Sequence, residues 1–135
     1  MFEKDYSLED VRDFFSMDRF ATQACGCQIE EASHGHAVCS LELTDIHRNA
    51  QGNVMGGAIF TLADFCLAIA CNMDESPTVS VSNTIEFMSA TRGTKLVATC
   101  DASKSGRSLG FYAVEVRDNL NTPVARMTAT CFRRS

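Results

Sequence analysis

An aspartate inside an apolar stretch is the first residue of this sequence that could do chemistry. Asp64 lies in MGGAIFTLADFCLAIACNM, residues 55–73, which carries no other charged side chain. Burying a carboxylate without a partner is costly. Two interpretations stay open. In the first, Asp64 lies on a narrow exposed edge or makes a structural hydrogen bond. In the second, it is a desolvated carboxylate at a cleft. In the second case it could act as a general base or as a nucleophile.

Two glycines precede this aspartate. Gly56 and Gly57 stand at the expected start of a helix, where backbone N–H groups have no intrahelical acceptor and no side chain covers them. Such amides can stabilise the negative charge that develops on a carbonyl oxygen. Helix capping, or close packing of the helix on a sheet, would also account for the pair.

A polar segment, residues 44–54, comes just before the glycines. It contains His47, Asn49 and Gly52 and follows neither the helical nor the strand period. We expect a loop of about the longest common length in a compact domain, and loops of that length are often functional. This loop brings donors and acceptors close to the start of the apolar helix.

Hydrophobic periodicity predicts the elements that position these residues. In chain order they are a capped helix at 7–20, strands at 24–32 and 35–43, a helix at 55–73 that breaks at 74–77, and strands at 78–87, 95–103, 108–117 and 124–133. An antiparallel sheet with one apolar face can wrap a helix that is apolar nearly all round. The sequence therefore predicts an α+β fold in which a curved antiparallel sheet surrounds one long helix. The other sheet face and the edges remain to be covered, which favours homo-oligomerisation.

Composition limits the class of protein. The 135 residues and 45% hydrophobic content suit one domain, residues 1–135, with one core. A formal charge of -5 without any Lys/Arg block argues against nucleic-acid binding. No stretch is typical of a secretory signal or long enough to span a bilayer, so we expect a cytoplasmic protein that binds no membrane.

The cysteines and histidines offer a weak alternative, a metal site. The seven cysteines are odd in number and scattered through apolar runs, which is typical of reduced, buried thiols. The candidate ligands are His34, His36, Cys39, Cys25 and Cys27. No second thiol pair completes a zinc site, and no GxGxxG or P-loop is present, so we expect neither a metal nor another cofactor.

The loop, the glycines and the aspartate together form a pattern. The pattern is HxNxxGxxxGGxxxxLAD, made here of His47, Asn49, Gly52, Gly56, Gly57, Leu62, Ala63 and Asp64. It is similar to the signature of hotdog-fold thioesterases of the PaaI-like family. The later segment VSVSNTIEFMSATRGTKLVA also resembles the family, and the likeness covers residues 24–134. It implies metal-free hydrolysis of an acyl-CoA by a hotdog protein that forms homodimers and a dimer of dimers, a tetramer.

The resemblance also assigns catalytic roles. Asp64 takes the place of the carboxylate that activates water or attacks the thioester, and the Gly56 N–H that of the oxyanion donor. Asn49 matches the loop residue that positions water or the carbonyl, and Ser80 a strand hydroxyl that holds the water. In related enzymes the carboxylate and the oxyanion donor act across the dimer interface, so the site would be shared between protomers.

Substrate binding is assigned to residues around these four. His47 and Gly57 belong to the signature, and the CoA phosphates could meet Arg92, Lys95, Lys104 and Arg107. For each basic residue alone, a solvated charged surface is the simpler explanation. The acyl group should occupy an apolar pocket beside the helix, with Phe60, Phe65 and Phe87 as candidate lining residues unless they only pack the core.

Two positions depart from the family pattern. Met55 stands where many relatives carry histidine, so any catalytic help from that histidine is absent. Ala90 replaces a proline, which should affect the rigidity of a turn more than the chemistry. Met55 motivates an alternative function, a non-catalytic hotdog protein that binds acyl-CoA as a ligand sensor. A hotdog hydratase fits less well, because its Asp/His pair is not evident at this helix.

Overall fold

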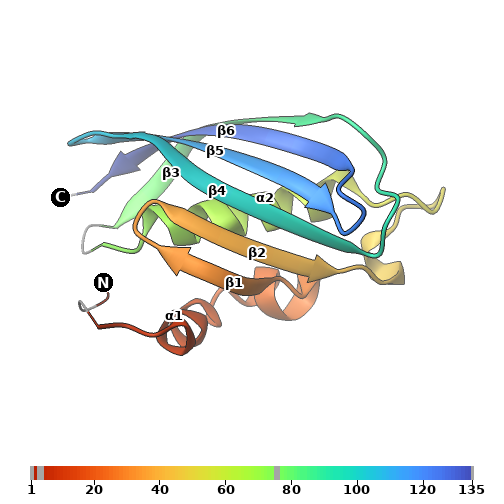
Figure 1. The fold of residues 1–135 in the computed structure, drawn as a ribbon, viewed down its shortest axis with the longest axis horizontal. Helices are drawn as coiled ribbons and strands as arrows, with labels where there is room; N and C mark the ends of the chain where they lie inside the picture. The colour runs from red at the N-terminus through yellow and green to blue at the C-terminus, as the bar shows by residue number, and fades with distance from the viewer. Residues whose placement is uncertain (1, 3–4, 75–76, 135) are drawn as a thin grey trace.

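One antiparallel sheet and one long helix make up most of the molecule. The computed structural model describes residues 2, 5–74 and 77–134. Their elements are α1 (Leu8–Phe15), η1 (Phe20–Cys25), β1 (Gln28–Ser33), β2 (His36–Glu42), η2 (Asp45–His47), α2 (Gly56–Cys71), β3 (Thr78–Phe87), β4 (Lys95–Ser105), β5 (Leu109–Asp118) and β6 (Pro123–Arg133). The sheet has the strand order β1-β2-β4-β5-β6-β3, and it curves over α2 (Figure 1).

The core lies between α2 and the concave face of the sheet. Along β5, buried Tyr112, Val114 and Val116 alternate with exposed residues, as a sheet with one solvated face requires. They contribute to one core with fully buried residues of α2 such as Leu62 and Ile69. This arrangement confirms the predicted α+β hotdog fold.

The four later strands and the central helix were predicted to within two residues of their observed ends. The His34-Gly35 turn between β1 and β2 is also confirmed, with Gly35 in the left-handed region at φ 75°. The helix break at 74–77 includes Glu75 and Ser76, which lie outside the described residues. No helix among the described residues has the length and apolar character needed to cross a bilayer.

The N-terminal region differs from the prediction. The capping box of Ser7 and Asp10 is present, but α1 ends at Phe15 instead of residue 20. The next helical segment is η1, a π-helix, so the strand expected from residue 24 begins only at Gln28. Residues 24 and 25 belong to η1, where Cys25 is buried, and Gly26 at φ 93° ends it. Packing against α2 therefore overrides the alternating pattern that suggested a strand.

The cysteines behave as predicted from their surroundings. All seven are free and buried. Burial raises the pKa of the Cys27 and Cys100 thiols, which keeps them protonated and unreactive. The cysteines are therefore small apolar residues of the core rather than a disulfide framework.

Candidate active site

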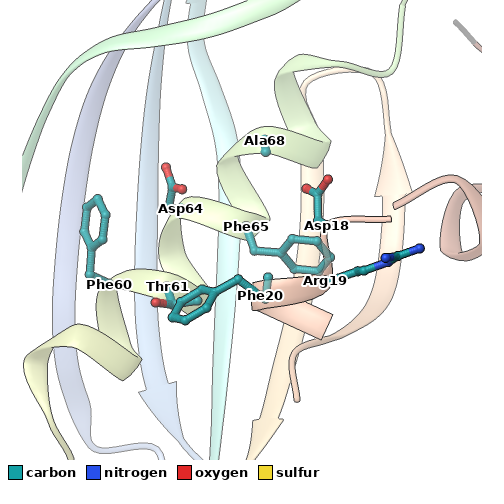
Figure 2. A pocket seen from close by; sticks show the side chains of 9 residues that line it. Asp18, Arg19, Phe20, Phe60, Thr61, Asp64, Phe65 and Ala68 are labelled. Atoms are coloured by element: carbon teal, nitrogen blue, oxygen red, sulfur yellow. The ribbon is translucent and has the colours of Figure 1, made fainter. Parts of the chain in front are cut away.

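Asp64 lies on a partly exposed stripe of α2. Gly57, Thr61 and Ala68 share this stripe, because residues spaced by three, four and seven positions lie on one helical face. The Asp64 side chain is half-buried and lines a cavity of about 450 Å³. The other lining residues are Asp18, Arg19, Phe20, Ala21, Phe60, Thr61, Phe65 and Ala68. Figure 2 shows the Asp64 side chain projecting from α2, with Phe60 on one side and Phe20 and Phe65 on the other.

The electrostatic surroundings favour a basic Asp64. Within the described part of the chain its carboxylate has no hydrogen-bond or ion-pair partner. Burial raises the pKa of Asp64, and the negative charge of Asp18 raises it further. A carboxylate with a raised pKa is a stronger base, and an unpaired one can bind a water molecule. Asp64 has both properties.

The start of α2 presents free amides. Met55 precedes the helix in an extended conformation, at φ -66° and ψ 142°, and no side chain caps the first turn. The Ala58 and Ile59 N–H groups donate to the Met55 carbonyl at 3.1 and 3.2 Å. The Gly56 and Gly57 N–H groups have no acceptor among the described residues. The first turn contains no acidic side chain either, so this helix end can bind an anion or an oxyanion.

Two further cavities flank the start of α2. One, of about 490 Å³, is lined by Met55 and Gly57 and shares Phe20, Phe60 and Thr61 with the Asp64 cavity. The two cavities therefore form one groove between α2 and η1.

The third cavity, of about 400 Å³, is lined by Gly56, Phe87, Ser89 and Thr91 among others. Gly56 and Asp64 line different cavities, and eight residues of α-helix separate them by about 12 Å of axial rise. Within one protomer the structure does not bring these two predicted catalytic residues together.

The loop residues of the signature are largely occupied by structural hydrogen bonds. His47 is buried; its Nε2–H donates to the Cys25 carbonyl at 2.6 Å, and its Nδ1 accepts the Thr44 N–H at 3.0 Å. This arrangement fits a neutral ring that fastens the loop to η1. The Asn49 Oδ1 accepts from the backbone N–H groups of Gln51 and Asn53, at 3.0 and 3.1 Å. Its Nδ2 group alone is left for a substrate.

Ser80 and the basic candidates lie outside the groove. The Ser80 hydroxyl is on the edge strand β3 and accepts from Asn83 Nδ2 at 3.4 Å. Arg92 and Lys95 lie at the start of β4, while Lys104 and Arg107 lie at its end, about 30 Å away along the strand. The four cations therefore form no single phosphate site within one protomer.

The histidines do not gather into a metal site. His36 lies between Asp101 and Glu31, at 2.7 and 3.0 Å from its ring nitrogens. Hydrogen bonds to Glu31 and Asp101 raise the pKa of His36. Among the residues that the structure describes, no group of three or more His, Cys, Asp or Glu side chains is arranged to hold a metal ion.

Comparison with known proteins identifies the family. The model of the Thioesterase superfamily matches residues 51–124, more than half of the chain. This chain belongs to the thioesterase superfamily. The matched segment includes α2 with Gly56 and Asp64, so family membership rests on the part of the chain that carries the candidate chemistry.

Two curated relatives in this superfamily are acyl-CoA thioesterases by name. Acyl-coenzyme A thioesterase PaaI of Escherichia coli is 31% identical over 76% of this chain and 74% of its own. Human acyl-coenzyme A thioesterase 13 is 33% identical over 63% of each chain, so the match spans slightly less than two thirds of the human protein. The solved structure of the E. coli PaaI protein from the phenylacetic acid degradation operon has a TM-score of 0.83 at 25% identity and covers 96% of this chain and 97% of that one.

Two residues that line the candidate site were not foreseen. Asp18 lines the Asp64 cavity but belongs to a segment expected to be part of a plain helix. Thr91 lines the Gly56 cavity, and its Oγ1 is buried with no hydrogen-bond partner in the described chain. Nothing in the sequence marks Asp18 as a cavity residue. Its place there depends on how the N-terminal segment folds against α2.

Proposed function

We propose that the protein hydrolyses acyl-CoA thioesters to free CoA and a carboxylic acid. The observation that carries this proposal is the unpaired, half-buried Asp64 carboxylate in a cavity with aromatic walls. The oxygen of water bonds to the thioester carbon, the C–S bond breaks, and the proton that water gives up ends on the CoA sulfur. Asp64 either takes that proton from water or attacks the carbonyl first, and both routes need a carboxylate at this place.

The Gly56 N–H serves as the oxyanion donor in this proposal. It stands at the N-terminus of α2 with no acceptor among the described residues, and Phe87 closes the space beside its Cα. Negative charge on the thioester oxygen would gain from a fixed donor at a helix N-terminus. Asn49 and Ser80 keep their proposed roles in positioning the carbonyl or the water.

The active site is shared between two protomers in this proposal. Gly56 and Asp64 of one chain line different cavities, so a single thioester would meet both only across an interface. The edge strand β3 supports such an interface, because Val79 and Val81 are exposed there and its outer edge has no strand partner among the described residues. Pairing of two β3 edges would join the sheets into a homodimer, and two dimers would form the tetramer.

The acyl group is proposed to lie in the groove between α2 and η1. The aromatic rings of Phe20, Phe60 and Phe65 line its cavities, which suits an uncharged acyl chain. The CoA phosphates would meet one of the two basic pairs at the ends of β4, which leaves the other pair as surface charge.

A thiol-release assay over aromatic, short-chain and long-chain acyl-CoAs tests the function. Turnover of at least one class, with kcat/KM in the usual range for enzymes of about 10⁴ M⁻¹s⁻¹ or more, is the expected result. Binding to these ligands is measured in parallel by calorimetry. Tight binding with no release of thiol would instead support the sensor, the function that Met55 motivates.

A further inference from the structure

Asp18 adds a second carboxylate to the Asp64 cavity. It comes from the connection between α1 and η1, outside the segment that matches the thioesterase superfamily. The Asp18 N–H donates to the Phe15 carbonyl at 3.0 Å, and its own carbonyl accepts the Thr22 N–H at 3.0 Å. The backbone of Asp18 is therefore held from both sides.

The N-terminal segment from α1 to η1 is fastened to the body of the protein. The Arg12 Nε donates to the Ile29 carbonyl in β1 at 2.9 Å. The Phe15 ring packs edge-on against Phe65 of α2, with 6.4 Å between ring centroids. Phe65 is the neighbour of Asp64 in the sequence, so this contact places the end of α1 against the helix that carries Asp64.

Among the described residues, no cation pairs with either carboxylate. In the described part of the chain, Asp18 has no side-chain hydrogen bond or ion pair, and burial raises its pKa. Arg19 also lines the cavity but pairs with neither aspartate, and its side chain extends away from Asp64 (Figure 2). The cavity wall therefore combines aromatic rings with two negative charges.

Besides Arg19, and His47, which lines the other cavity of the groove, the titratable groups near α2 in the described chain are thiols and one phenol. From the elements packed against α2 they are Cys25, Cys27, Cys39, Cys100, Tyr112 and Cys131. Burial raises the pKa of Tyr112 to about 12, so the phenol is neutral at physiological pH. Among the described residues, Asp18 is the charged group that acts on Asp64.

Building on the proposed role of Asp64, we propose that Asp18 is a positioning and specificity-determining residue of this site. Its negative charge makes Asp64 a stronger base and disfavours acyl groups that carry a carboxylate of their own. Asp18 lines the cavity but is itself exposed to solvent, whereas Asp64 is half-buried. Their like charges repel, and the partial burial of Asp64 makes the repulsion larger than in bulk water. The preferred substrates are then acyl-CoAs with an uncharged acyl group.

The test compares Asp18→Asn with Asp13→Asn. Both variants remove one negative charge from the N-terminal region, but Asp13 lies on the exposed face of α1 and lines neither cavity of the groove. The Asp64 carboxyl group is titrated by carbon-13 NMR, with its signal assigned by its loss in Asp64→Asn. We expect Asp18→Asn to move this titration to lower pH and Asp13→Asn to leave it in place. An unchanged titration in Asp18→Asn, or an equal change in Asp13→Asn, overturns the proposal.

Substrate selection provides the second readout. Hexanoyl-CoA and adipoyl-CoA have the same chain length and differ by one terminal carboxylate. We expect Asp18→Asn to raise the ratio of kcat/KM for adipoyl-CoA over hexanoyl-CoA by at least about 3-fold, by relief of one like-charge interaction. A ratio equal to that of the parent contradicts the specificity role. The NMR titration needs no turnover. If Asp18→Asn shifts the titration of Asp64 but the protein hydrolyses no thioester, the proposed function is refuted and the effect of Asp18 on Asp64 still stands.

Discussion

Two aspartates of this protein lie in opposite hydrogen-bonding environments. Asp118, at the end of β5, is buried and accepts four backbone N–H groups, those of Arg92, Gly93, Leu120 and Thr122, at 2.8 to 2.9 Å. Burial alone would raise the pKa of Asp118, but the hydrogen bonds hold it well below its usual range. Asp64 is half-buried without any such bond, and burial raises its pKa. Asp118 thus fastens a turn, while Asp64 keeps its lone pairs free for a substrate or water.

The backbone amides show the same contrast. The four N–H groups around Asp118 are satisfied by the protein's own carboxylate, whereas the Gly56 and Gly57 N–H groups have no acceptor in the described residues. Backbone N–H groups at an exposed helix N-terminus have no intrahelical acceptor, so those of Gly56 and Gly57, which line cavities, are available to a ligand. The difference distinguishes the structural polar groups around Asp118 from the groups that we propose to be catalytic.

The largest expected effect comes from removing one free donor. Gly56→Pro deletes the N–H at the first helical position, where proline is well tolerated, and the extended Met55 suits a following proline. We expect kcat to fall by about 10²–10³, the usual effect of losing one oxyanion donor. Gly56→Ala is the matched control, since it keeps the N–H and places a similar carbon 3.2 Å from Phe87. Equal losses in both variants would assign the effect to packing instead of the amide.

The next effect concerns stability. Asp118→Ala leaves four backbone N–H groups without their acceptor, and we expect the free energy of unfolding to fall by about 2–4 kcal/mol. Urea denaturation measures this loss. Turnover per folded molecule should fall far less than in Gly56→Pro. A stability equal to that of the parent would contradict the structural role of Asp118.

The smallest effect is a difference in pH dependence. The folded pKa of Asp118 is lowered, so its stabilisation is present above its unfolded pKa, about 4, and is lost as the pH falls through the folded value. The folded pKa of Asp64 is raised, so its effect has the opposite sign: stability is lost as the pH rises from about 4 through the folded pKa. Asp118→Asn should therefore show a smaller stability deficit at pH 3 than at pH 7, and Asp64→Asn should be at least as stable as the parent at pH 7. Thermal unfolding between pH 3 and pH 7 checks both signs.

The sequence predicted the sheet and the central helix well, because period and turn residues determine them locally. It also singled out Asp64 and the glycine pair, since a charge in an apolar helix and glycines at its start are visible in one segment. It could not predict that His47 has both ring nitrogens occupied, or that Asp18 reaches the cavity. Both depend on η1, whose packing against α2 replaced the strand expected there. Contacts between segments distant in sequence were thus the part that local patterns did not reveal.

The most direct test of the central claim is the turnover of Asp64→Asn in the thiol-release assay, measured with its thermal stability in the same preparation. This substitution keeps the size of the side chain and removes the base, and we expect kcat to fall by at least about 10² while the Tm stays equal or rises. Turnover close to that of the parent in a folded Asp64→Asn protein would contradict the assignment of Asp64 as the catalytic carboxylate.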